Sequence, residues 1–340
     1  MSDLTNCRQR SRSKQHLLAL WRPDCMDSNL MIPISHRPAS PVDLEAKNKH
    51  SHGMQLLLKY SSMASDIAVL LALVVLYIGL ERAQPRKVFL IRTTLWKHSY
   101  PYHENTVPSW TVPVYAIGAP LLAFSLARLV LSPRKVTTDV WYRTLYACLF
   151  AIFLTAAITN CLKIAIGRPR PNFVFRCWPD GAPVFAGENL YGGYAVCSTD
   201  SATEAEHRKS FPSGHSSWSG AGLGFLTAWL LGQTRAFTGG GRAWPLMLSL
   251  VPLLASLVVG VTRITDYWHH VSDVCVGLAL GWFIAFVVYL KLYPFFTHPM
   301  CDVPLYTLRP ARPAKASNIA LQRPESTLEG GTLPNLPAAV

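Results

Sequence analysis

Residues 142–172 read YRTLYACLFAIFLTAAITNCLKIAIGRPRPN, and this stretch decides how the chain folds. Positions 142–166 are almost continuously apolar, and about 20 such residues are enough for a helix to cross a bilayer. Gly167 follows, and then Pro169 and Pro171, and both residue types end helices well. The stretch therefore predicts a membrane-crossing helix that ends at a short basic segment containing prolines.

Similar apolar runs lie on both sides of this stretch. They cover residues 63–80, 112–131, 216–231, 244–261 and 274–292, and each has roughly the length that a membrane helix needs. Across the chain 50% of the residues are hydrophobic and 15% are charged, whereas soluble domains have about 25% charged residues. We therefore expect an all-α integral membrane protein, a six-helix bundle over residues 63–296 with its active site built from loops at one membrane face.

The two ends of the chain are polar. Residues 1–62 and the Pro-rich residues 297–340 predict disordered tails. No apolar segment follows the arginines near the N-terminus, so they do not form a secretory signal. A transit peptide is one alternative, but Asp24 and Asp27 favour a solvated tail. Six spans put both termini on one side, and the positive-inside rule favours cytoplasmic termini only when arginines kept for chemistry are left out of the count.

The chain carries a net charge of +13. Its basic residues lie in the tails and between apolar runs, without a motif that binds DNA or RNA, so we expect no nucleic-acid partner. Anionic headgroups or a phosphorylated substrate explain the charge more simply. The cysteines follow no zinc-binding pattern. Cys177 and Cys197 share one polar loop, where they either pair, if the loop faces an oxidising compartment, or remain two free thiols.

Three short stretches carry residues suited to chemistry, and the first begins at Lys163. This lysine interrupts the end of an apolar span, where an ionisable residue is costly. It is therefore either functional or a side chain whose stem extends along the apolar surface to the interface. Arg168 and Arg170 follow closely, and a guanidinium group can bind two phosphate oxygens at once.

The second stretch, FPSGHSS at 211–217, comes directly before the fourth apolar run. Ser213 is a suitable N-cap for a helix there. Gly214 lets the backbone approach a ligand closely, and the free N–H groups at a helix start bind anions. His215 falls in the first turn, at the membrane surface. Taken alone, the stretch also fits an ordinary capping turn.

The third stretch, TRITDYWHHVSD at 262–273, connects the last two apolar runs. His269 and Asp273 are four residues apart, so on a helix they lie on the same face. A carboxylate that binds one imidazole nitrogen fixes the tautomer and leaves the other nitrogen as the nucleophile. His270 is three residues from Asp273 and could make the same contact, so the spacing leaves both histidines open. Arg263 adds another guanidinium group.

Together the three stretches indicate phosphoryl transfer. Cationic side chains, one oriented histidine and a second histidine suit a reaction through a covalent phosphohistidine. A two-metal phosphatase needs several carboxylates, and these stretches offer only Asp266 and Asp273. We therefore expect a metal-independent reaction without a cofactor.

The same residues resemble the three-part signature of the type 2 phosphatidic acid phosphatases, a superfamily that includes vanadium haloperoxidases and glucose-6-phosphatase. The matching parts run from Lys163 to Arg170-Pro171, over Pro212-Ser213-Gly214-His215, and from Arg263 through His269 to Asp273. Thr262 departs from the pattern, since serine is common at that position. Stretches at 100–108, 112–115, 167–173 and 266–270 are similar to plant-type lipid phosphate phosphatases, and the resemblance covers roughly residues 65–300.

The resemblance implies a role for each matched residue. His269 would be the nucleophile and Asp273 would orient it, while His215 would protonate the leaving alkoxide and then activate water. The phosphate oxygens would be held by Lys163, Arg170, Ser213, Gly214 and Arg263. The assignment also selects His269 over His270.

The resemblance further implies a phosphatidate phosphatase that also accepts lysophosphatidate and diacylglycerol pyrophosphate. Its partner would be a membrane phospholipid, and its active site would be lumenal or extracytosolic, in the endoplasmic reticulum or plasma membrane. The sequence does not indicate an oligomeric state. Two alternatives stand beside this reading: a relative acting on an isoprenoid diphosphate, a sugar phosphate or a lipid acceptor, and a six-span transporter.

Overall fold

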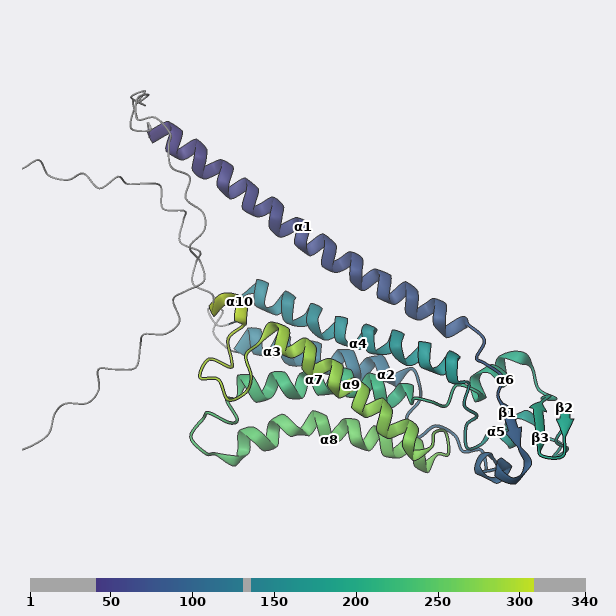
Figure 1. Ribbon diagram of the computed structural model, residues 1–340. Helices are drawn as coiled ribbons and strands as arrows, with labels where there is room; N and C mark the ends of the chain where they lie inside the picture. The colour runs from purple at the N-terminus through teal and green to yellow at the C-terminus, as the bar shows by residue number, and fades with distance from the viewer. Residues whose placement is uncertain (1–40, 131–135, 309–340) are drawn as a thin grey trace, which may run out of the picture. The chain divides into compact units, whose positions relative to one another are not determined.

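The computed structural model describes residues 41–130 and 136–308 (Figure 1). The chain divides into two compact units, residues 1–60 and 61–340, which we describe separately. In the first unit the described part is the beginning of helix α1 (Pro41–Arg82). The remainder of the two predicted tails, residues 1–40 and 309–340, lies outside the described residues.

Five helices in the described part of the chain are long and apolar enough to cross a membrane. They cover Tyr60–Arg82 of α1, Thr111–Val130, Thr138–Ile166, Ala243–Thr265 and Val271–Leu292. Large apolar side chains such as Leu71, Val75 and Val258 point outward and are more than half exposed, as expected for surfaces that face lipid rather than water. The predicted helical integral membrane fold is confirmed, and the loops add the three short strands described below.

Helix α7 (Gly214–Gln233), which coincides with the fourth predicted span, differs from these five. It is 20 residues long, but serines and glycines make it less apolar than the others. It lies between α4 (Thr138–Ile166), α8 (Ala243–Thr265) and α9 (Val271–Leu292) and contacts all three (Figure 1). The protein interior therefore surrounds most of α7, and the count of six spans stays a prediction.

Small residues allow α7 and α9 to pack closely. A Cβ atom at Gly281 of α9 would overlap the carbonyl oxygen of Ser217, and one at Gly277 would lie 2.7 Å from the Ser213 carbonyl oxygen. Such close backbone approach needs residues without side chains. The packing holds the start of α7 against the start of α9, and these are the ends that carry His215 and Asp273.

Helix α4 begins and ends at residues suited to those positions. Thr137 caps its first turn by accepting a hydrogen bond from the Val140 amide. The C-cap residue Gly167 has φ of 61°, a left-handed conformation that favours glycine, and a Cβ atom there would overlap the Arg86 carbonyl oxygen. The predicted end of the helix at Gly167 is confirmed, and it leaves Lys163 in the last turn.

The second span is built from three consecutive segments, α2 (Thr111–Pro113), the π-helical η2 (Val114–Gly118) and α3 (Ala119–Val130). Phe124 of α3 packs against Phe225 and Trp229 of α7. These rings form the main hydrophobic core together with Ile152 of α4 and Tyr289 of α9. The core therefore joins four of the long helices.

The loops at one end of the bundle form a small second core. A three-stranded antiparallel sheet has the order β1-β3-β2, from β1 (Phe89–Ile91), β2 (Phe185–Asn189) and β3 (Gly192–Ala195). The short helices beside it are η1 (Arg92–His98), α5 (Phe173–Cys177) and α6 (Ser201–His207). A disulfide joins Cys177 to Cys197, whose Cα atoms are 4.5 Å apart. Cys177 is buried with Phe173 and Trp178, so the polar loop at 168–212 has its own folded structure.

Parts of the predicted tails are ordered. Helix α1 begins at Pro41, so residues 41–62 are helical where the sequence led us to expect disorder. Proline fits the first turn of a helix because its missing N–H group has no partner there. At the other end the chain continues past residue 297 to α10 (Leu305–Leu308). Cys301 is fully buried against Gly232, and Asp302 pairs with Arg235, so side-chain packing fixes a segment whose composition is typical of disorder.

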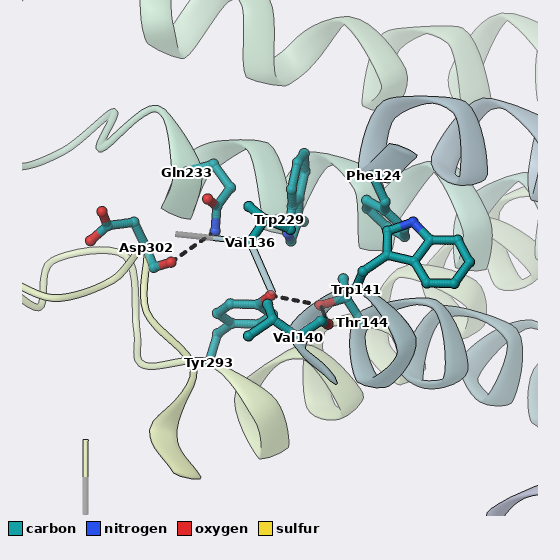
Figure 2. Close-up of a pocket in the computed structure, with 9 residues that line it drawn as sticks. All are labelled: Phe124, Val136, Val140, Trp141, Thr144, Trp229, Gln233, Tyr293 and Asp302. Atoms are coloured by element: carbon teal, nitrogen blue, oxygen red, sulfur yellow. Dashed lines mark hydrogen bonds between the residues drawn. The ribbon is translucent and has the colours of Figure 1, made fainter. Parts of the chain in front are cut away.

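The end of the bundle where α7 ends contains a small cavity (Figure 2). Its lining includes Phe124, Trp229 and Tyr293, and its volume is about 10 Å³. The Tyr293 and Thr144 hydroxyl groups lie 2.7 Å apart, and the Gln233 amide donates to the Asp302 carbonyl oxygen. Such a volume holds at most about one water molecule, so this part of the bundle is closed by packing.

Candidate active site

A much larger cavity, of about 390 Å³, lies at the end of the bundle where α7 begins. Its lining includes residues from all three stretches singled out in the sequence: Lys163, Arg170, Gly214, His215, Arg263 and His269. Ser213 and Asp273 are fully buried beside it. The fold thus brings together the eight residues predicted for catalysis and phosphate binding.

His269 lies in the turn between α8 and α9 and is buried. Its Nδ1 atom is 2.7 Å from the carbonyl oxygen of Ser210. A carbonyl oxygen only accepts hydrogen bonds, so Nδ1 carries the proton and Nε2 keeps a free lone pair. Burial lowers the pKa of His269 from 6.5 to about 4. The ring is therefore neutral near pH 7, with Nε2 as the nitrogen available to react.

Asp273 contacts other groups more closely than it contacts His269. Its Oδ1 atom accepts from Arg168 Nη1 at 2.6 Å, and Oδ2 accepts from the Ser210 hydroxyl at 2.6 Å. Oδ2 also lies 3.0 Å from the His270 amide nitrogen and 3.2 Å from its Nδ1 atom. The distance to His269 Nδ1 is 3.8 Å, which is too long for a hydrogen bond.

The sequence led us to expect a direct hydrogen bond between Asp273 and His269. In the structure the Ser210 carbonyl oxygen occupies that position instead, and Asp273 is closer to His270. Sequence reasoning did not single out Ser210. No spacing rule identifies it, because its contacts depend on a loop that folds back against α9.

Arg170 is buried among groups that fix its guanidinium plane. Its Nε atom donates to the Glu206 carbonyl oxygen at 3.0 Å, and Nη2 pairs with the Glu206 carboxylate. The guanidinium carbon lies 4.6 Å from the centre of the Trp268 ring, a cation–π distance. Burial alone would raise the pKa of Glu206, but the charges of Arg170, Lys163 and Lys209 outweigh that effect and lower it. The ion pair is therefore charged at neutral pH.

Lys163 and Gly214 lie next to each other in the cavity. Lys163 is buried in the last turn of α4, and Gly214 is the first residue of α7. A Cβ atom at Gly214 would come within 3.2 Å of the lysine Nζ atom. Ser213 caps α7 by accepting from the Ser216 amide, as the sequence predicted. The positive end of the helix therefore points toward the same space as the lysine.

Arg263 is fully buried and held from two sides. Nη1 donates to Asn105 Oδ1 at 2.6 Å, and Nη2 donates to Asp266 Oδ2 at 2.8 Å. Asp266 also accepts from both the amide and the hydroxyl of Thr106. The side chain of Arg263 is thus fixed by a segment that lies far from it in sequence.

Residues 103–107 form this segment, and they also contact the rest of the site. The His103 carbonyl oxygen accepts from Trp268 Nε1 at 2.9 Å. The Val107 carbonyl oxygen is 3.1 Å from His215 Nε2, which therefore carries the ring proton. From the sequence, these residues stood out only by their similarity to plant-type enzymes. The signal that could have identified them is the polar Asn105-Thr106 pair beside aromatic residues.

The cavity combines cations and carboxylates. Lys163, Arg170 and Arg263 line it together with Glu81 and Glu206. Asn160 donates to Glu81 at 2.7 Å. Among the described residues, no group of three or more His, Cys, Asp or Glu side chains is placed to hold a metal ion. The arrangement suits an anion, with two histidines on its border.

Comparison with known proteins agrees with this geometry. The family model described as the PAP2 superfamily matches residues 144–296. Lipid phosphate phosphatase 1 from Arabidopsis thaliana is 39% identical over 253 residues, which is 74% of each chain. Lipid phosphate phosphatase 2 from the same plant is 36% identical, over 74% of this chain and 84% of its own length.

A fungal relative is similar as well. Diacylglycerol pyrophosphate phosphatase 1 from Saccharomyces cerevisiae is 32% identical over 71% of this chain and 83% of its own. No solved structure matches the chain. On the extent of these similarities and on the three stretches that meet in one cavity, the chain belongs to the PAP2 superfamily of phosphatases.

Proposed function

We propose that this protein hydrolyses lipid phosphomonoesters, with phosphatidate as a main substrate, and releases diacylglycerol and phosphate. The observation that carries the proposal is the single cavity where His269 and His215 face Lys163, Arg170 and Arg263. The names of the relatives, which are lipid phosphate and diacylglycerol pyrophosphate phosphatases, support it.

The reaction has two steps. His269 Nε2 attacks phosphorus while the bond to the lipid oxygen breaks, and His215, which takes up a second ring proton beside the phosphate dianion, gives that proton to the leaving alkoxide and becomes neutral. Water then attacks the phosphohistidine, His215 takes the water proton, and phosphate leaves with Nε2 free again. Asp273, 3.8 Å from Nδ1, stabilises the positive charge of the phosphohistidine.

Cationic and backbone groups bind the phosphate oxygens. Lys163, Arg170 and Arg263 supply positive charge, while the Ser213 hydroxyl and the backbone N–H group of Gly214, both at the start of α7, supply further donors. In the structure Glu206 accepts a hydrogen bond from the Arg170 guanidinium, and Asn105 accepts one from that of Arg263. Phosphate oxygens therefore replace, or share, these existing hydrogen bonds when substrate binds.

A lipid substrate fits the position of the cavity. Lys163 lies near the end of a membrane span, and the cavity wall also includes the apolar or aromatic side chains of Tyr77, Val112 and Trp218. A phosphate at this depth stays attached to acyl chains within the bilayer. Soluble phosphates lack that concentrating effect, and phosphodiesters lack one of the free oxygens that the cations bind.

We propose further that both termini are cytoplasmic and that the site faces the lumen or the exterior, in the endoplasmic reticulum or plasma membrane. The disulfide between Cys177 and Cys197 supports this orientation, because disulfides persist in oxidising compartments. Protease protection of epitope tags at the two termini in sealed vesicles tests it. If the tags were cleaved only after the vesicles are opened with detergent, the termini would lie inside the vesicles and the proposed orientation would be wrong.

The central experiment measures phosphate release by purified protein in mixed micelles. Phosphatidate, lysophosphatidate, diacylglycerol pyrophosphate and glucose 6-phosphate are compared, with His269→Ala as the blank. We expect the lipid phosphates to be preferred and the activity to persist in excess chelator. Preference for the sugar phosphate would reject the lipid assignment, and dependence on magnesium would reject the metal-free mechanism.

A further inference from the structure

Ser210 contacts three parts of the active site through three different groups. Its amide nitrogen donates to the Arg168 carbonyl oxygen at 3.0 Å. Its hydroxyl donates to Asp273 Oδ2 at 2.6 Å, and its carbonyl oxygen accepts from His269 Nδ1 at 2.7 Å. The residue is fully buried, so none of these contacts is shared with solvent.

Asp273 cannot act on His269 by a hydrogen bond of its own in this arrangement. The separation of 3.8 Å is too long, and both carboxylate oxygens already accept from Arg168, Ser210 and His270. The shortest connection between the carboxylate and the imidazole runs through a single residue, from the Ser210 hydroxyl to the Ser210 carbonyl.

We propose that Ser210 is a positioning residue that connects Asp273 to the nucleophile His269. The hydroxyl fixes the carboxylate and, in return, the carboxylate fixes the orientation of the Ser210 peptide. The carbonyl oxygen then keeps Nδ1 protonated and Nε2 directed at the phosphate. The inference rests on the proposed function, in which His269 attacks phosphorus.

The connection has a second support at Arg168. The Arg168 side chain binds the other oxygen of Asp273, and its backbone carbonyl accepts from the Ser210 amide. Arg168 and Ser210 are thus joined to each other and hold the two oxygens of one carboxylate. This closed set of hydrogen bonds fixes the carboxylate without a direct hydrogen bond to His269, so its positioning effect on the ring, as distinct from its charge, is transmitted through Ser210.

Substitution of Ser210 tests the link selectively, because the contact with Asp273 is made by the side chain and the contact with His269 by the backbone. Replacement by alanine removes the hydroxyl but keeps the carbonyl oxygen that binds His269. Asp273 is a less direct probe, since it also caps α9 by accepting from the His270 amide. A loss of activity in Ser210→Ala therefore reports the link between the carboxylate and the Ser210 peptide.

The test measures kcat and KM for phosphatidate in Ser210→Ala. We expect kcat to fall about tenfold or more, because small misplacement of a reacting group is costly, with KM changed less than about twofold. Inhibition by vanadate should keep its concentration dependence, since the phosphate-binding cations are untouched. Ser210→Thr, which restores a hydroxyl, should recover much of kcat.

The matched control is Ser249→Ala. Ser249 is also fully buried, but its hydroxyl donates to the Pro245 carbonyl oxygen within α8, near the other end of that helix. We expect its kcat to equal that of the wild type. Equal losses in the two variants would mean that removing any buried serine damages the protein, and would overturn the assignment.

A double-mutant cycle separates a link through Asp273 from an independent effect. In an Asp273→Asn background, Ser210→Ala should reduce kcat by less than about twofold further, because the partner of the hydroxyl is already altered. The proposal would be overturned if the losses of kcat in the two single variants combined fully in the double variant. It would also be overturned if Ser210→Ala alone kept the wild-type kcat. If Ser210→Ala does not fold, Ser210→Cys replaces it in both measurements, since a thiol is a weak donor of similar size.

One further variant, His269→Ala, separates the positioning role of Ser210 from the phosphohistidine mechanism. His269→Ala is assayed beside these variants. Turnover in His269→Ala would reject the phosphohistidine mechanism itself. An inactive His269→Ala together with a fully active Ser210→Ala would reject only the positioning role.

Discussion

The two ends of helix α7 differ in what they bury. Where α7 begins, a cavity of about 390 Å³ is bordered by buried Lys163, Arg170 and Arg263. Where α7 ends, aromatic side chains and the chain around Cys301 leave a cavity of only about 10 Å³ (Figure 2). The same helix therefore supports a site that is open and charged at one end and a closed apolar core at the other.

The difference indicates which end of the bundle is built for activity and which for stability. Buried charges are costly unless they are paired, and the two arginines of the open end are held by Glu206, Asn105 and Asp266. At the closed end Tyr289 stacks on Tyr293 and makes a tilted ring contact with Phe296. Substitutions at the open end should therefore change activity, and those at the closed end should change stability.

The largest expected effect comes from the two histidines of the open end. His269→Ala and His215→Ala should each reduce kcat on phosphatidate by at least about 10³-fold, because in the proposed mechanism one forms the covalent bond and the other transfers the proton. His270→Ala removes one donor to Asp273 and should keep most of the activity. The readout is phosphate release per molecule of folded enzyme.

The control for these variants is His298→Ala, an exposed histidine beyond the closed end. It should have wild-type kcat. A loss at His270 as large as that at His269 would mean that the nucleophile is assigned to the wrong histidine.

Two glycines of α7 provide a direct comparison of its ends. In Gly214→Ala the new methyl group lies 3.2 Å from Lys163 Nζ, so we expect kcat/KM to fall about tenfold with little change in stability. In Gly232→Ala it meets the Tyr289 hydroxyl and the Cys301 carbonyl oxygen, at 2.5 and 2.9 Å. Overpacking of this kind costs about 1–3 kcal/mol of stability, and kcat of the folded fraction should be unchanged.

Thermal unfolding in detergent and phosphate release distinguish the two outcomes. If Gly232→Ala lowered kcat while its melting temperature stayed the same, the two ends would be coupled. The division between an active and a structural end would then be incorrect.

The disulfide near the open end should affect both properties. Cys177 lies at the end of α5, and Cys197 precedes α6, which carries Glu206 and His207 against Arg170. Removing a disulfide that closes a short loop costs about 2–4 kcal/mol. We expect Cys177→Ser to be less stable by that amount and to lose severalfold in kcat, because Arg170 becomes less well fixed.

Mass spectrometry without reductant checks the bond itself. Both cysteines should resist alkylation in the native protein until reductant is added. Free alkylation of both cysteines without reductant would show that the disulfide does not form. The control for the substitution is Cys148→Ser, at a buried cysteine outside any disulfide.

How much of this arrangement the sequence predicts depends on the range of the interactions. The apolar run before Gly167 and the cap at Ser213 are local features, and both were predicted correctly. The ordered segment around Cys301 and the strands in the 168–212 loop were not, since tertiary packing overrides composition there. The contacts of Ser210, Glu206 and Asn105 join residues far apart in sequence, and spacing rules cannot detect such pairs.

The smallest expected effect concerns pH. Burial lowers the pKa of His269 to about 4, with Asp273 opposing the shift and Arg170 and Lys163 adding to it. An unprotonated imidazole is the reactive form, so the rate of His269 modification by diethyl pyrocarbonate should stay almost constant from pH 8 to about pH 5. It should then fall with a midpoint near 4, whereas a free histidine has its midpoint near pH 6.5.

Peptide mapping after modification measures this rate without the titration of a phosphate substrate. Vanadate should protect His269, because it occupies the same cavity. The sign of the shift is the decisive point: the lowered pKa places loss of the reactive form below, not above, that of free histidine. A midpoint at or above 6.5 would mean that Asp273 acts on the imidazole more strongly than burial does, and the distance of 3.8 Å between them would then have to shorten in solution.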